Sequence, residues 1–182
     1  MAPPPRPHIV LMGLRGSGKT TLARLLSNRL NRRAFDLDHL LALRCEAANV
    51  GAAFTAQGEK AFREVEATLL GEQLALPPPP RILALGGGTP TAPGAAEALR
   101  KAAASGTHIV YLRATAATLR ARLERTDLTT RPSLTGKGVL AEIDAVFAKR
   151  DALYRSLATR VIETDAMSED EVLEAIESGL AK

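Results

Sequence analysis

The sequence contains few of the residues that mark exported, membrane-spanning or nucleic-acid-stacking proteins. Cys45 is the only cysteine among 182 residues, so neither an intramolecular disulfide nor a CxxC zinc or redox motif can form. No apolar run approaches the roughly 20 residues that a membrane-spanning helix requires. Residues 1–7 are rich in proline and lack the apolar stretch of a signal peptide. We therefore expect a cytoplasmic protein without a membrane segment.

Aromatic side chains are also scarce, which bears on the kind of ligand. Tryptophan is absent and aromatic residues make up 3% of the chain, so stacking platforms for nucleic acids are missing. The chain is nevertheless basic, with a net charge of +4, and 18 of its 24 basic residues are arginine. The planar guanidinium group suits phosphate and carboxylate ligands. We expect small anionic ligands, no nucleic-acid partner, and a monomer.

The length and the pattern of the chain predict one α/β domain over residues 1–182. Short apolar runs alternate with longer amphipathic segments, which is typical of a parallel sheet with crossover helices. Ser168 and Glu171 have the spacing of a capping box and predict the start of the last helix. The polar segment 125–138 is expected to be a mobile lid, and residues 1–7 are an extension to which we assign no role. The expected strands are 8–12, 34–37, 81–85, 107–112 and 159–163, and the expected helices include 19–30, 58–74 and 139–154.

A phosphate-binding motif follows the first expected strand. Residues 13–20, Gly-Leu-Arg-Gly-Ser-Gly-Lys-Thr, match GxxxxGK[ST] between a strand and a helix. Its glycines let backbone N–H groups turn toward a polyphosphate at the positive end of the helix. Lys19 is expected to reach the β and γ phosphates, and the Thr20 hydroxyl to bind Mg²⁺. The motif leaves the acceptor open, because GTPases, ATPase motors and small-molecule kinases all contain it.

Two carboxylates follow the second expected strand. Asp36 and Asp38 are two apart in a segment expected to be extended, so both can face one cleft. Asp36 suits indirect coordination of Mg²⁺ through water. Asp38 can accept hydrogen bonds from substrate hydroxyls and the proton of the attacking one. The alternative for Asp38 is a structural role as the N-cap of the next helix.

Two arginines are predicted to lie on apolar helix faces. Arg63 is three residues from Glu66 on the helix 58–74, and an inward charge is costly unless it is paired, so these two are expected to hold each other. Arg150 falls on the apolar side of the helix 139–154, whereas Glu142 and Lys149 fall on the other side. Together Arg63 and Arg150 can hold a planar carboxylate, although internal ion pairs are the alternative for both.

Two further features belong to loops. Gly86, Gly87 and Gly88 end the third expected strand, where a backbone can approach a ligand closely. Ligands of open parallel sheets bind at the carboxyl ends of the strands, which favours a single site there. Arg131 precedes Pro132 in the lid and could swing over the phosphates, with a solvated loop arginine as the alternative.

Taken together, these residues resemble the shikimate kinase family. The matching pieces, within residues 13–164, are GLRGSGKTT, FDLDHL, GEKAFREVE, LALGGGTP, IVYLRAT, RPSL and KRDALYR. The family often has RPLL and PLY where this chain has RPSL and ALY, and neither departure removes a chemical group. The resemblance implies a three-layer P-loop kinase fold of the nucleoside monophosphate kinase type, with a five-stranded parallel sheet and helices on both faces.

The resemblance also implies an activity and its site. The activity is transfer of the γ-phosphoryl of ATP, with Mg²⁺, to the 3-hydroxyl of shikimate in aromatic amino acid biosynthesis. A kinase for another hydroxy acid such as gluconate, or a non-catalytic ligand sensor on the same fold, are the alternatives. The catalytic candidates are Lys19, Asp38 and Arg131, and the metal candidates are Thr20 and Asp36. ATP is expected to contact Gly13, Gly16, Ser17, Gly18, Lys19, Thr20, Thr21, Arg125 and Arg131. Shikimate is expected to contact Asp38, Arg63, Gly86, Gly87, Gly88 and Arg150.

Overall fold

A five-stranded parallel sheet forms the centre of the computed structural model, which describes residues 7–77, 79–125 and 140–180. The order of the strands is β2-β3-β1-β4-β5, and every neighbouring pair is parallel. The expected strands are confirmed, and each end lies within one residue of its predicted position. The strands are β1 (Ile9–Met12), β2 (Ala34–Asp36), β3 (Ile82–Ala84), β4 (His108–Arg113) and β5 (Arg160–Glu163).

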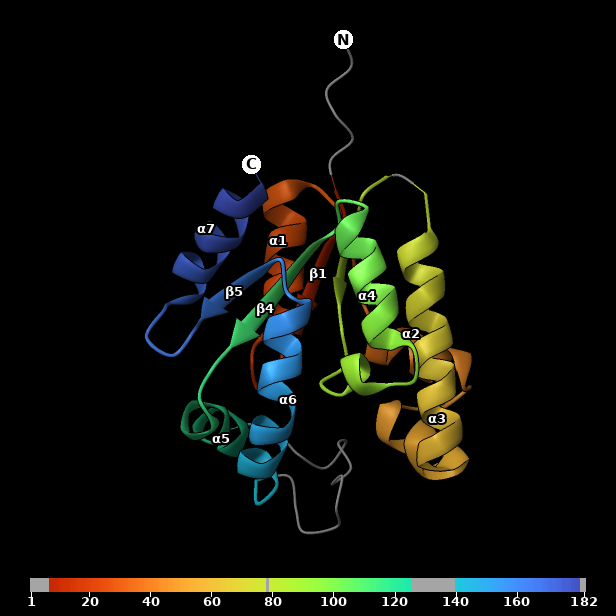
Figure 1. Cartoon of the computed structure of the whole chain (residues 1–182). Coiled ribbons are helices and arrows are strands. Elements are labelled where there is room, and N and C mark those ends of the chain that lie inside the picture. The colour runs from red at the N-terminus through yellow and green to blue at the C-terminus, as the bar shows by residue number, and fades with distance from the viewer. Residues whose placement is uncertain (1–6, 78, 126–139, 181–182) are drawn as a thin grey trace.

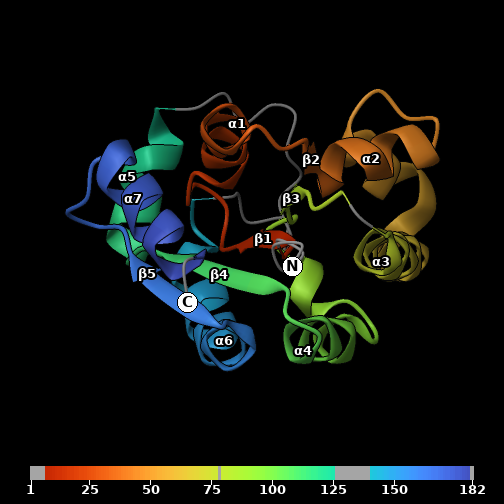
Figure 2. The same ribbon diagram turned by 90° about the horizontal axis from the view of Figure 1, so that it is seen from above.

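Helices cover both faces of this sheet, so the expected three-layer arrangement is confirmed (Figures 1 and 2). One face carries α1 (Lys19–Leu30) and α7 (Glu169–Leu180). The other carries α4 (Ala95–Ala104) and α6 (Ile143–Leu157), and α3 (Val50–Ala75) packs against α4. The shorter elements are α2 (Leu37–Arg44), the 3-10 helix η1 (Thr89–Thr91) and α5 (Ala116–Glu124). None of the described helices is long and apolar enough to cross a membrane.

The side chains of β1 show why this strand is central. All four are buried, with Val10 and Met12 in the core beneath α4 and α6, and Ile9 and Leu11 in the core beneath α1 and α7. Burying each such side chain contributes about 1.5–3 kcal/mol. A strand that is apolar on both faces is stable only when helices cover both. This is the case for β1, which lies in the middle of the sheet between β3 and β4.

The observed starts of three helices can be compared with the expected ones: α3 and α6 start elsewhere, and α7 starts as expected. The helix expected from residue 58 is the second part of α3, which begins at Val50 and is interrupted at Gly58, where φ is 74°. The expected capping box is confirmed, because the Ser168 N–H donates to Glu171 Oε2 at 2.7 Å and the Glu171 N–H to Ser168 Oγ at 3.3 Å. The helix expected from residue 139 begins at Ile143, and residue 139 lies outside the described residues.

Candidate active site

The loop between β1 and α1 is shaped by its glycines. Gly16 and Gly18 have φ values of 80° and 88°, in the region that L side chains avoid. A Cβ on Gly13 would lie 2.5 Å from Ser17 Oγ and 2.7 Å from the carbonyl oxygen of Leu112. No side chain of the described residues caps α1, so the first backbone N–H groups of the helix remain available to a ligand. A glycine-rich loop at the start of a helix suits a phosphate group.

Lys19 lies at the bottom of this loop. Its side chain is buried, and Nζ donates to the carbonyl oxygens of Gly13 and Leu14, each at 2.9 Å, and to Ser17 Oγ at 3.4 Å. A cation held by the loop itself needs little rearrangement to meet a phosphate oxygen. We call the space lined by Gly16, Gly18, Lys19, Thr20, Thr21 and Asp36 the phosphate chamber.

Thr20 and Asp36 meet at one side of the phosphate chamber. Thr20 Oγ1 donates to Asp36 Oδ2 at 2.6 Å, across 16 residues of sequence. Asp36 is also the N-cap of α2, because its Oδ1 accepts the N–H of Asp38 at 2.9 Å. The role of helix N-cap, which was the structural alternative for Asp38, is therefore filled by Asp36. The expectation that both aspartates share an extended segment is wrong, because β2 ends at Asp36 and α2 begins at Leu37.

Asp38 is nonetheless turned into the cleft, in the first turn of α2. Burial and the neighbouring carboxylate of Asp36 raise its pKa to about 6, while the positive charges of Lys19 and Arg15 act in the opposite direction. Glu66 raises the pKa further, although less than Lys19 lowers it. A carboxyl group with this pKa can accept a proton near neutral pH.

The raised pKa of Asp38 predicts a pH-dependent cost in stability. The folded protein holds the proton up to about pH 6 and the unfolded chain only to about pH 3.8, so stability falls as the pH rises between these values. We expect Asp38→Asn to increase the free energy of unfolding by about 1–3 kcal/mol at pH 7.5 and to leave it nearly unchanged at pH 3.5. Urea unfolding of both proteins at the two pH values measures this, and equal stability at pH 7.5 would contradict it.

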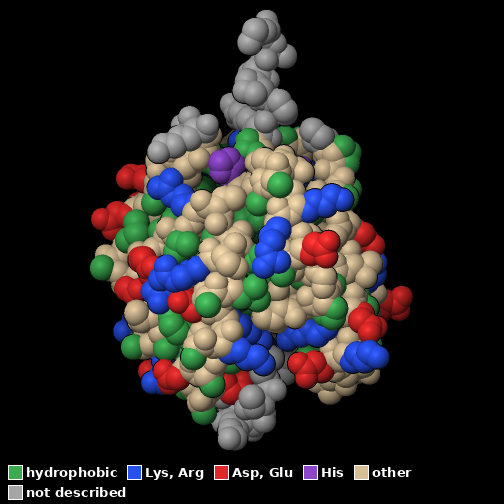
Figure 3. All heavy atoms as spheres, in the orientation of Figure 1, with side chains coloured by type: hydrophobic (Ala, Val, Ile, Leu, Met, Phe, Trp, Pro, Cys, Tyr) green, Lys and Arg blue, Asp and Glu red, His purple; other side chains and the backbone are tan. Residues whose placement is uncertain are grey.

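A second space adjoins the phosphate chamber between α3 and α6. We call it the acceptor chamber, and its polar lining is Arg15, Asp38, Arg63, Glu66, Gly87, Gly88, Glu142 and Arg150. Phe54 and Phe62 supply an apolar wall. Asp38, Arg15 and Gly87 line both chambers, so the two are parts of one cleft. In the space-filling view, Lys and Arg side chains gather between α6 and α3 (Figure 3). The structure thus places Arg63 and Arg150 in the same pocket.

The expected pair of Arg63 and Glu66 is confirmed. Arg63 Nη1 lies 2.6 Å from Glu66 Oε2, and only 3% of the Glu66 side chain is exposed. The other carboxylate oxygen of Glu66 accepts the Thr89 hydroxyl at 2.6 Å. Because the carboxylate is satisfied on both sides, it fixes the guanidinium group of Arg63 in one orientation toward the chamber.

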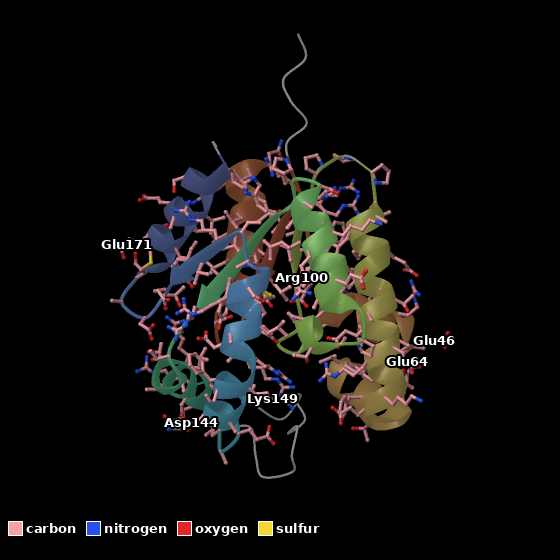
Figure 4. The ribbon with its side chains drawn as sticks, viewed as in Figure 1. Glu46, Glu64, Arg100, Asp144, Lys149 and Glu171 are labelled. Carbon is pink, nitrogen blue, oxygen red and sulfur yellow. The ribbon has the colours of Figure 1, made fainter. Side chains whose placement is uncertain are left out.

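Arg150 is held by the glycine segment, and it forms no ion pair with a carboxylate of the described residues. Its Nη1 donates to the carbonyl oxygen of Gly87 at 3.0 Å, and the buried hydroxyl of Tyr154 donates to the same oxygen at 2.9 Å. A neutral partner leaves the positive charge of Arg150 available to an anion. Lys149, beside it, is exposed on α6 as expected (Figure 4).

Two of the three glycines lie where an added Cβ would meet close neighbours. A Cβ on Gly88 would lie 2.9 Å and 3.0 Å from the two terminal nitrogens of Arg63. A Cβ on Gly86 would overlap Asp38 Oδ1 and lie 2.8 Å from Thr89 Oγ1. The glycines therefore make room for the two side chains that the sequence assigns to the acceptor, although Gly86 itself does not line either chamber.

Sequence reasoning missed two residues of the acceptor chamber. Arg15 occupies a variable position of the phosphate-binding motif and packs beside Gly87. In the sequence, only its position within this motif could have indicated that it lines the acceptor chamber. Glu142 was expected on the polar side of a helix, which is wrong: its side chain is buried and lines the chamber. Glu142 is the N-cap of α6 and its backbone is helical, so its burial comes from the way the start of the helix packs against the chamber.

Of the two ATP contacts that are predicted outside the phosphate-binding loop and the start of α1, only Arg125 lies in the part of the chain that the structure describes. Arg125 is exposed at the end of α5 and lines neither chamber. Arg122, one turn earlier, does line the phosphate chamber, where its guanidinium donates to the carbonyl oxygen of Thr164 at 2.8 Å. Arg131 lies outside the described residues, as does the rest of the expected lid beyond Arg125.

Comparison with known proteins identifies the family of the chain. The chain is 38% identical over 160 residues to the shikimate kinase of Chromohalobacter salexigens, covering 87% of this chain and 83% of that protein. It matches the structure of the shikimate kinase of Acinetobacter baumannii in complex with shikimate, with a TM-score of 0.83, 29% identity and coverage of 96% and 93%. A gluconokinase from Sinorhizobium meliloti shares the fold, with a TM-score of 0.60, 18% identity and coverage of 97% and 93%. The family model for shikimate kinase matches residues 15–181, and the chain belongs to this family.

Proposed function

We propose that the protein transfers the γ-phosphoryl group of ATP to the 3-hydroxyl of shikimate. The observation that carries this proposal is the single cleft in which a phosphate-binding loop adjoins two arginines and a carboxylate with a raised pKa. Shikimate is a carboxylate with several hydroxyls, and Arg63 and Arg150 provide the guanidinium groups that suit its acid group. Family membership and the shikimate-bound relative support the same substrate.

The catalytic roles follow from the positions of the side chains. Asp38 lies where the two chambers meet, so it can orient the 3-hydroxyl and take its proton as the oxygen attacks. Lys19 and the N–H groups at the start of α1 stabilise the negative charge of the transferring phosphoryl group. Arg131 is proposed to add a further positive charge from the lid. Catalysis then results mainly from positioning and charge neutralisation.

The oxygen-bearing side chains at one side of the phosphate chamber suit Mg²⁺. Thr20 and Asp36 present a hydroxyl and a carboxylate, which are the oxygen donors that Mg²⁺ prefers, and they already contact each other. These two residues would hold the ion, Asp36 through water, and when bound the ion neutralises charge on the phosphates. The part of the chain that the structure describes contains no group of three or more His, Cys, Asp or Glu side chains placed so that they could hold a metal ion on their own.

A coupled assay of ADP release tests the proposed reaction. With ATP and Mg²⁺, we expect rapid turnover with shikimate and release close to background with gluconate or without an acceptor. Turnover with gluconate at a rate equal to that with shikimate would support the gluconate kinase alternative. Tight binding of nucleotide and shikimate without any ADP release would support the sensor alternative.

Gly88→Ala tests the close contact of the glycine segment with Arg63. The added methyl group must displace the guanidinium group, so we expect the KM for shikimate to rise about tenfold, a change of about 1.4 kcal/mol, while the KM for ATP stays within twofold. Gly71→Ala is the matched control, because an added Cβ there meets nothing within 4 Å in α3. Steady-state kinetics of both variants measure this, and a shikimate KM unchanged in Gly88→Ala would contradict it.

A further inference from the structure

A second basic cavity lies at the end of the sheet opposite the catalytic cleft. Its volume is about 860 Å³, and it is formed by the end of α1, the start of β2 and the segment before β3. In Figure 1 these segments meet at the top, whereas the strands point down toward the cleft, and Figure 2 views the molecule from this end. We call it the distal groove, and the residues that matter here are Asn31, Arg32, Arg33, Phe35, Pro80 and Arg81.

The charged residues that line the distal groove are all arginines. No aspartate or glutamate is among the described residues that form it. Arg33 is exposed, and neither Arg33 nor Arg81 forms an ion pair within the described part of the chain. On the neighbouring helix α1, by contrast, Arg29 pairs with Asp170 at 2.5 Å. The like charges of Arg33 and Arg81 repel each other, and an anion between them would lower this cost.

Arg81 is held in place by contacts that do not neutralise it. Its guanidinium carbon lies 5.6 Å from the centre of the Phe35 ring, and Nη2 donates to the carbonyl oxygen of Pro77 at 3.4 Å. Its Nε is buried and has no hydrogen-bond partner in the described structure. An arginine stacked on an aromatic ring presents a fixed positive edge, so it loses little conformational entropy when an anion binds.

Two histidines lie within reach of the charges of these arginines. Burial and then the charge of Arg81 lower the pKa of His8, whose Nδ1 accepts the Arg81 N–H at 3.2 Å. Burial and then the charge of Arg32 lower the pKa of His108. Both histidines stand at the amino ends of central strands, next to the groove's arginines. The cationic character therefore extends from the groove to the strand ends beside it.

We propose that the distal groove binds a multivalent anion of the phosphate class, at a site separate from the ATP and shikimate positions. Arg32, Arg33 and Arg81 supply the positive charge, and Phe35 and Pro80 form an apolar wall beside it. The parallel sheet separates the two sites, because the groove opens at the amino ends of the strands and the cleft at their carboxyl ends. A bound anion can thus occupy the groove while the cleft holds nucleotide.

Amide NMR spectroscopy with sodium pyrophosphate as the probe tests this site. The full chain is saturated with ADP so that the phosphate chamber is filled, and pyrophosphate is then titrated. We expect saturable shifts of the backbone amides of Asn31, Arg33 and Arg81, and little change at Gly16 and Gly18. Shifts confined to Gly16 and Gly18, or equal shifts with sodium chloride at the same ionic strength, would overturn the proposal.

Variants separate the groove from general surface charge. Arg33→Ala, which alters an exposed side chain, should weaken pyrophosphate binding about threefold to tenfold, and Arg33→Ala with Arg81→Ala should weaken it at least tenfold. Arg24→Ala is the matched control, because Arg24 is exposed on α1 and does not line the groove. Its pyrophosphate affinity should equal that of the wild type. Unchanged affinity in the single and double variants, or an equal loss in Arg24→Ala, would contradict the assignment.

Discussion

Asp38→Asn is expected to lower kcat for shikimate by about 10²–10⁴-fold, because the side chain loses the ability to accept a proton but keeps its size. The KM for ATP should stay within about threefold, since the phosphate-binding loop and Lys19 are unchanged. Steady-state kinetics with both substrates measure the two effects. A loss of less than tenfold in kcat would mean that Asp38 only aligns the hydroxyl, which an amide oxygen can also do.

The pH dependence of the wild type gives a second readout of the same group. Proton acceptance requires the carboxylate, and the pKa of Asp38 is about 6 in the free protein, so kcat/KM for shikimate should rise through pH 6 and level off by about pH 8. In Asp38→Asn this inflection should disappear. Asp170→Asn is the control, because Asp170 pairs with Arg29 far from the cleft and its change should alter neither kcat nor the profile.

Arg150→Ala is expected to raise the KM for shikimate by about 30- to 150-fold. A charge-assisted hydrogen bond to a carboxylate contributes about 2–3 kcal/mol, and the variant loses it. The glycine segment should keep its position because Tyr154 still donates to the carbonyl oxygen of Gly87. The KM for ATP should remain within twofold, and an equal rise for both substrates would contradict a role specific to the acid.

Arg155 provides the matched control on the same helix. Its guanidinium group pairs with Asp151 at 3.2 Å and with Glu163 at 2.9 Å, outside the cleft. Arg155→Ala should therefore leave both KM values unchanged. Arg63→Ala is a poorer test, because it leaves the buried carboxylate of Glu66 without its charged partner and costs stability as well as binding.

Patterns that depend on burial could be predicted from the sequence. The strands are short apolar runs, and the side chains of β1 face two cores, so the alternation of strand and helix determined the layers. The inward position of Arg63 beside Glu66 followed from helical periodicity, because only a paired charge is stable on an apolar face. The phosphate-binding loop followed from glycine spacing, since Gly16 and Gly18 adopt angles that other residues avoid.

Features set by the ends of helices could not be predicted in the same way. Asp36 caps α2 and so turns Asp38 into a helical position, and the residue types alone allow either aspartate to be the cap. Glu142 is the N-cap of α6, and its burial depends on how the start of this helix packs against the cleft, which a helical wheel does not give. Arg15 lies in a loop, and its contact with Gly87 depends on tertiary structure between two strand ends. The roles of Arg125 and Arg131, and the monomeric state, stay predictions.

Isothermal titration calorimetry with shikimate and with its methyl ester measures whether the cleft binds the carboxylate group. The ester keeps every hydroxyl and loses only the negative charge. We predict that the wild type binds shikimate at least 30-fold more tightly than the ester, and that Arg150→Ala reduces this preference to less than fivefold. A preference that is equally large in Arg150→Ala, or absent from the wild type, would contradict the assignment of the acceptor chamber to the carboxylate of shikimate.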